Sequence, residues 1–169
     1  VALIGDFVME PRYQGAGSSM VNPTRLETME QMAENCGLQV VGMNRGYKRN
    51  GEADDVLQKE ALELARMADV VVYCFGLDEM SESEGLDRTH MRIPQNQIHL
   101  LESLLQVNSN IVGVLSAGSS IEMPLFNNCT GLSQRFQKSG AIRFGFRGIN
   151  LIMFRQCPDQ PGLIGFLLQ

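Results

Sequence analysis

The stretch DVVVYCFG at residues 69–76 decides the fold of this 169-residue chain. Six apolar or aromatic residues follow one aspartate, and a glycine ends the run. So short a continuous apolar run is typical of a strand buried on both faces, as in parallel sheets that are covered by helices. Apolar runs alternate with amphipathic segments on either side of it. We therefore predict an α/β fold with a mostly parallel sheet sandwiched between helices.

The same reasoning places the neighbouring elements. Strands are predicted at residues 1–4, 38–43 and 111–115, and helices at residues 24–35, 57–68 and from Pro94 onward. Ligands of such folds meet the loops at the carboxyl ends of the strands. The loops that matter for function are therefore expected at residues 5–23, 76–93 and 116–124.

Composition limits the classes of protein to which the chain can belong. A hydrophobic share of 44% and a charged share of 20% are typical of a single soluble globular domain. No apolar run approaches the roughly 20 residues that span a bilayer, so no membrane partner is expected. The net charge of -5 argues against nucleic acid. A chain that enters a core strand at Val1, without the basic start of a signal peptide, is expected to be a piece of a longer protein.

No cofactor or metal site is predicted from the cysteines or the glycines. Cys36 and Cys74 lie in apolar runs and are expected to be buried thiols, and no CxxC pair is present. The loop YQGAGSS at residues 13–19 does not have the GxGxxG spacing of a dinucleotide site, because Met20 stands where the third glycine would be. Taken alone, this loop is either a tight surface turn or a segment that approaches a ligand closely.

The loop after the decisive strand is rich in acids. Five carboxylates lie between Asp78 and Asp87. By composition this is a solvated acidic loop or a calcium site, although it lacks the spacing of an EF-hand. His90 follows without a serine or cysteine nucleophile pattern. Composition alone leaves these alternatives open.

Four segments in this order resemble the C-terminal domain of glycoside hydrolase family 3, which contains β-glucosidases. They are YQGAGSS at 13–19 with NP at 22–23, the strand at 70–76, ESEGLDR at 82–88 with PQNQ at 94–97, and GSSIEMP at 118–124. The resemblance implies an α/β sandwich packed on an N-terminal (β/α) barrel domain of the same parent protein. It also implies hydrolysis of terminal β-linked sugars, in oligosaccharides or glycosides, with net retention.

The resemblance also assigns catalytic roles. In the family pattern the general acid/base is the glutamate directly before glycine, which is Glu84 here. Glu82 is a second candidate, because the spacing of two puts both carboxylates on the same side of an extended loop. Neighbouring acids and partial burial are expected to raise the pKa of the acid, so that it holds a proton near neutral pH.

Supporting roles are assigned more broadly. Asp78, Gly17 and Ser18 are expected to border the sugar pocket and bind substrate. Asp87 and Arg88 are interpreted as structural support, either as a buried ion pair that pins the loop or as an ordinary surface pair.

The family nucleophile is an aspartate on the barrel, so none is assigned here and the isolated chain is expected to be inactive. Two alternatives remain open: a non-catalytic carbohydrate-binding or interaction module, and a flavodoxin-like or receiver-type domain. The receiver type would need an acidic pair after the first strand, where only Asp6 stands.

The chain changes character near residue 127. Residues 1–126 hold 9 Lys+Arg against 18 Asp+Glu, whereas residues 127–169 hold 5 against 1. The expected division is a domain at 1–126 and a tail of the same domain at 127–169 that is divergent or frame-disrupted. No element is predicted in the tail except a possible helix near 131–138.

A frame disruption just after Phe126 makes a direct prediction about the coding DNA. Another reading frame downstream of Phe126 should encode the Asn-Pro-Ser-Gly segment and glycine-rich helix entry of the family, which the printed tail lacks. Translating all frames of the genomic sequence checks this. If no frame has a family-like ending, the tail is divergent instead.

Overall fold

The computed structural model describes residues 1–12, 16–18 and 20–122, together with the backbone of residues 133–136, 141–146 and 149–154. The strands form one sheet in the order β2-β1-β3-β4-β7-β6-β5. Five are mutually parallel: β1 (Ala2–Ile4), β2 (Gly42–Asn44), β3 (Val71–Gly76), β4 (Ile111–Ser116) and β7 (Ile149–Phe154). The other two, β6 (Ala141–Phe146) and β5 (Ser133–Phe136), extend the sheet in antiparallel orientation.

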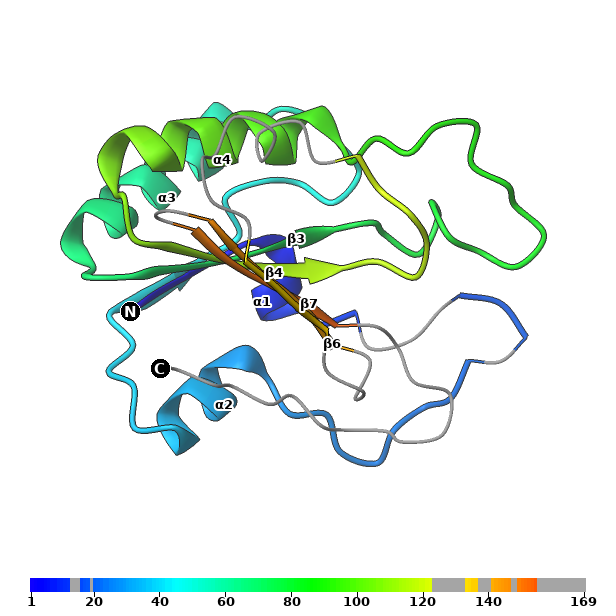
Figure 1. Cartoon of the computed structure of the whole chain (residues 1–169), viewed down its shortest axis with the longest axis horizontal. Helices are drawn as coiled ribbons and strands as arrows, with labels where there is room; N and C mark the ends of the chain where they lie inside the picture. Colours follow the sequence, from blue (N-terminus) through cyan, green and yellow to red (C-terminus); the bar gives the residue numbers. More distant parts are fainter. Residues whose placement is uncertain (13–15, 19, 123–132, 137–140, 147–148, 155–169) are drawn as a thin grey trace.

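Helices cover both faces of the sheet. On one face lie α3 (Asp55–Met67) and α4 (Gln95–Val107), and on the other lie α1 (Asp6–Met9) and α2 (Met29–Asn35) (Figure 1). The predicted sandwich of a mostly parallel sheet between helices is therefore confirmed. Within the part of the chain that is described, no helix is both long and apolar enough to cross a bilayer.

The core is centred on β3, the strand from which the fold was predicted. Every residue of β3 is buried, with β1 on one side and β4 on the other. Tyr73 and Phe75 stack at 5.2 Å between ring centroids, and Tyr47 meets Tyr73 edge-on at 6.3 Å. Burial of Cys74 raises the pKa of its thiol to about 12, so Cys74 behaves as a small apolar side chain.

Several boundaries differ from the sequence-based prediction. The helix predicted at 24–35 begins only at Met29, because Thr28 and Gln31 form a reciprocal capping box. The strand predicted at 38–43 is β2 at Gly42–Asn44, since the parallel register pairs Ala2 with Gly42. The short helix α1 was not predicted.

Two further expectations are wrong. Cys36 is exposed rather than buried, because it caps the C-terminal end of α2 instead of continuing its buried face. The possible helix near 131–138 is replaced by β5, whose backbone pairs with β6. Edge pairing with β6 provides hydrogen bonds that an isolated segment of this length lacks, so tertiary context outweighs local preference here.

The ends of β1 and β3 require glycine. Gly5 has φ +130° and Gly76 has φ +147°, a region that L side chains rarely adopt. A Cβ on Gly76 would lie 1.9 Å from the carbonyl oxygen of Ser116. The backbone thus passes directly against β4 as it leaves the sheet and enters the acidic loop.

Gly76→Ala is predicted to destabilise the domain strongly, because both its backbone angle and the contact with Ser116 exclude a methyl group. Gly51→Ala is the matched control: Gly51 also has a positive φ, +85°, but nothing lies within 4 Å of its Cβ position. The control should cost about 1–2 kcal/mol, the usual cost of a left-handed residue. Urea unfolding of the two variants measures the difference, and equal losses would contradict the steric argument.

Candidate active site

The candidate site lies at the carboxyl edge of the sheet, where three loops meet. Gly76 of β3 is in register with Ser116 of β4, so the loops that follow leave the sheet side by side. The loop after β1 joins them through a bridge between Ala16 and Ser83, where the N–H of Glu84 donates to the Ala16 carbonyl at 3.3 Å. The N–H of Glu122 donates to the Met91 carbonyl at 2.7 Å and ties the third loop to the second.

Glu84, the predicted acid/base residue, is exposed at this edge. Its Oε2 accepts two hydrogen bonds from Ser18, one from the hydroxyl at 2.6 Å and one from the backbone N–H at 2.9 Å. Gly17 allows this close approach, because a Cβ there would lie 2.6 Å from the Glu84 Cβ. Two residues predicted to bind substrate, Gly17 and Ser18, therefore contact the predicted acid directly.

Glu82, the second candidate, is in a different environment. Its side chain is only 9% exposed and forms an ion pair of 2.5 Å with Arg12, itself 6% exposed. The N–H of Gly118 donates to both carboxylate oxygens, at 2.9 and 3.1 Å, and the hydroxyl of Ser119 also donates to Oε1. With donors on both oxygens, Glu82 is a largely buried, paired carboxylate that joins all three loops.

The pKa values of both glutamates differ from the expectation. The hydroxyl and N–H of Ser18 lower the pKa of Glu84 below its ordinary value. For Glu82, burial acts to raise the pKa, but the hydrogen bonds from Ser119, Gly118 and Arg12 together outweigh it and lower the pKa. The expected rise from neighbouring acids is therefore wrong for this chain, because each carboxylate faces donors rather than other acids.

The remaining predicted residues, Asp78, Asp87 and Arg88, have different surroundings from those expected. Asp78 is half-buried and accepts a hydrogen bond from the N–H of Ser81 at 2.7 Å, which closes a turn in the acidic loop. The buried pair of Asp87 with Arg88 is not formed, and Asp87 is exposed. Arg88 instead donates to the Ser119 hydroxyl at 2.7 Å and the Ser120 carbonyl at 2.5 Å, both on the third loop.

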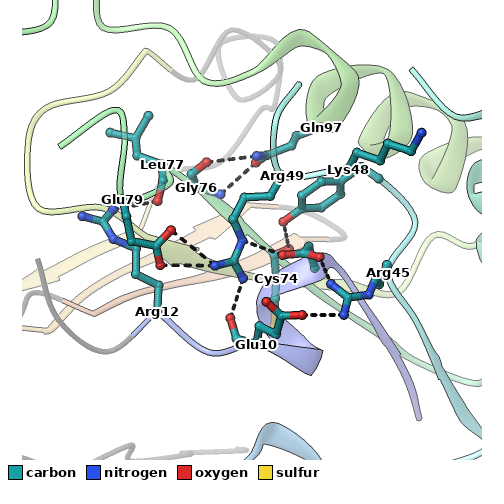
Figure 2. A network of polar contacts seen from close by, with 12 residues as sticks. Glu10, Arg12, Arg45, Lys48, Arg49, Cys74, Gly76, Leu77, Glu79 and Gln97 are labelled. Carbon is teal, nitrogen blue, oxygen red and sulfur yellow. Dashed lines mark hydrogen bonds and ion pairs between the residues drawn. The ribbon is translucent and has the colours of Figure 1, made fainter. Parts of the chain in front are cut away.

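A second cluster of charged residues lies beside the loops, next to the ends of β1 and β2 (Figure 2). The carboxylate of Asp6, buried at the start of α1, accepts hydrogen bonds from both Arg45 and Arg49. Arg45 also binds Glu10 at 2.6 Å, and this contact lowers the pKa of Glu10. Arg49 reaches Glu79 in the acidic loop at 3.2 Å. The cluster thus links the segment after β2 to the loop that carries Glu84.

The start of the acidic loop is held by an amide clamp (Figure 2). The side chain of Gln97, buried in α4, accepts from the N–H of Gly76 at 2.8 Å and donates to its carbonyl at 3.0 Å. Beside it, Arg12 donates to the Leu77 carbonyl at 2.6 Å. Both contacts satisfy backbone groups that a strand end would otherwise leave unpaired.

Sequence reasoning did not identify Arg12, Arg45 or Arg49 as site residues. The available signal was charge balance, because an acidic loop that leaves a buried strand needs cations from elsewhere. Among the described residues, no group of three or more His, Cys, Asp or Glu side chains is arranged to hold a metal ion.

The arrangement is matched by a known family. The model of the glycosyl hydrolase family 3 C-terminal domain matches residues 1–138. This chain belongs to glycosyl hydrolase family 3. The predicted membership is therefore confirmed, and the other fold families considered are set aside.

Relatives of the family 3 domain support the assignment. Thermostable β-glucosidase B of Acetivibrio thermocellus is 47% identical over 145 residues, which are 84% of this chain and 19% of the relative. An exo-α-(1→6)-L-arabinopyranosidase of Bifidobacterium breve is 41% identical over 134 residues, 78% of this chain and 18% of the relative. The chain therefore spans about a fifth of the length of these relatives.

A solved structure agrees with the fold. The family 3 β-glucosidase of Bifidobacterium adolescentis superposes with a TM-score of 0.71 at 33% identity, covering 89% of this chain and 19% of that one. The α/β fold is thus the one found in this family.

Ser18→Ala is predicted to raise the pKa of Glu84 toward the ordinary value of about 4.3, because it removes the strongest donor to the carboxylate. NMR titration of ¹³C-labelled glutamate in the isolated chain measures it. Ser109→Ala is the matched control, since Ser109 is exposed between α4 and β4, at the opposite edge of the sheet, and should leave the pKa of Glu84 unchanged. Because the folded pKa is lowered, the Ser18 contact stabilises the fold above about pH 4.3 and is lost as pH falls through the folded pKa. An unchanged Glu84 titration in Ser18→Ala would contradict the assignment.

Proposed function

We propose that this chain is the acid/base-bearing domain of a retaining, exo-acting β-glycosidase and that Glu84 is the general acid/base. The observation that carries the proposal is the contrast between two glutamates two positions apart. Glu84 is exposed at the carboxyl edge of the sheet, where ligands of such folds bind, whereas the Glu82 side chain is only 9% exposed and is bound by donors on both oxygens. Only Glu84 can reach a substrate without breaking an ion pair.

The mechanism requires a second carboxylate from outside the described domain. In retaining hydrolysis one carboxylate attacks the anomeric carbon, and the other protonates the leaving oxygen and later removes a proton from water. The two lie about 5–5.5 Å apart. We assign the nucleophile to the barrel domain of the parent protein, so the isolated chain is inactive.

The lowered pKa of Glu84 fits this division between two domains. In the isolated chain its carboxylate is ionised at neutral pH, held by the Ser18 donors. A nucleophile carboxylate brought within about 5 Å places a like charge beside Glu84, which raises its pKa. The acid therefore gains its proton only when the two domains and the sugar meet.

Substrate contacts follow from the same geometry. Gly17 and Ser18 lie against Glu84 and border the position of the scissile oxygen, and Asp78 lies in the turn that opens the same loop. The proposed substrates are terminal β-linked glycosides and oligosaccharides. The choice of sugar is assigned to the barrel domain, since relatives of this domain carry the names of both a β-glucosidase and an α-L-arabinopyranosidase.

The test is Glu84→Ala in an enzyme that joins this chain to a family 3 barrel, either its own or that of thermostable β-glucosidase B. Removing a general acid should lower kcat/KM about 10²- to 10⁴-fold on glycosides with poor leaving groups. Dinitrophenyl glycosides should be affected far less in glycosylation, since their leaving group needs no proton. Azide should restore turnover and give a β-glycosyl azide.

Glu63→Ala, at an exposed position on α3, controls for expression and assembly. If Glu84→Ala matches this control on every substrate, the acid/base role fails. The domain would then be a non-catalytic carbohydrate-binding or interaction module.

A further inference from the structure

The largely buried ion pair of Glu82 with Arg12 joins segments that are 70 positions apart in the sequence. Removal of a charged side chain from water costs on the order of several kcal/mol, which an ion pair and further hydrogen bonds must offset. The Glu82 carboxylate has both. Its donors come from both flanking loops: Arg12 from the loop after β1, and Gly118 and Ser119 from the loop after β4.

We infer that Glu82 is a positioning residue, which fixes the loop of Glu84 between its two neighbours; this rests on the acid/base role proposed for Glu84. Glu82 does not touch substrate in this assignment. It acts through the backbone of residues 82–84, because one bridge and one hydrogen bond to Ala16 follow it directly. The Glu82 carboxylate anchors the backbone on one side of Ser83, and Ser18 binds the Glu84 side chain on the other.

The pairing extends beyond Arg12. The Ser119 hydroxyl donates to Glu82 and accepts from Arg88, so a chain of hydrogen bonds runs from Arg12 through Glu82 and Ser119 to Arg88. The Arg12 guanidinium also donates to the Leu77 carbonyl, at the point where the acidic loop leaves β3. Glu82 thus fixes the loop near its start and near its middle.

The geometry separates positioning from simple support of the fold. The contacts of Glu82 lie in loops beyond the strand ends, whereas the core around β3 is closed without it. Loss of Glu82 should therefore displace Glu84 and leave the sheet intact. A displacement of about 1 Å at a reacting group can cost 10²-fold in rate.

Glu82→Gln keeps the size of the side chain and removes its charge. In the barrel-joined enzyme it should lower kcat/KM about 10- to 100-fold on phenyl glycosides, which need the acid, and less than about 3-fold on dinitrophenyl glycosides. Azide should not rescue it, because the Glu84 carboxylate is still present. Arg12→Met should behave in the same way, and the double variant should lose less than the product of the two single losses.

The outcomes distinguish failure of each proposal. Equal losses of Glu82→Gln on both substrates mean that Glu82 only supports folding, which overturns the inference while Glu84→Ala still shows azide rescue. Azide rescue of Glu82→Ala, with Glu84→Ala unaffected, makes Glu82 the acid and overturns both proposals.

A second measurement keeps the inference testable if the joined enzyme fails to assemble. In the isolated chain, Glu82→Gln should speed hydrogen exchange at the N–H of Glu84 and leave exchange in β3 unchanged. Glu63→Ala is the control and should change neither. Unchanged exchange at Glu84 in the Glu82 variant would overturn the inference.

Discussion

Complete burial of β3 is the constraint on which the rest of this domain depends. A strand with apolar side chains on both faces must lie inside a sheet and between helices. Its neighbours in the sheet are β1 and β4, and α1 on one face and α4 on the other complete its environment. Because β1, β3 and β4 are parallel, the loops that follow their carboxyl ends all leave from the same edge of the sheet. The three loops therefore converge as a result of core packing, and this does not depend on the polar contacts among them.

The polar contacts determine which acid faces solvent. Eighteen acids stand against nine basic residues in the first 126 residues, so few cations can be placed beside buried carboxylates. The structure places Arg12 at Glu82, and Arg45 and Arg49 at Asp6. Among the residues that the structure describes, only Ser18 donates to the Glu84 side chain, and its donors are neutral. Glu82, paired with Arg12, is therefore largely withdrawn from solvent, whereas Glu84 remains exposed at the edge of the sheet.

The sequence predicted the elements that are continuously buried, and it failed to predict boundaries and contacts that depend on local geometry. The apolar runs located β3, β4 and α4 closely, and the predicted parallel sheet implied that the loops after its strands would lie at one edge. The edge strand β2 is half-buried and gave a displaced prediction, while the Thr28 and Gln31 capping box was a readable signal that was missed. The partner of Glu82 was out of reach, because nothing local relates it to Arg12 at a separation of 70 positions.

The supports of Glu82 and Glu84 that the structure describes all come from this chain: Arg12, Ser18, Gly118 and Ser119. A loop that is prepared within its own domain does not need a particular neighbour to acquire its shape. Such a unit can be recombined in evolution with different partner modules, and its set of loop contacts can be inherited unaltered while the partner diverges.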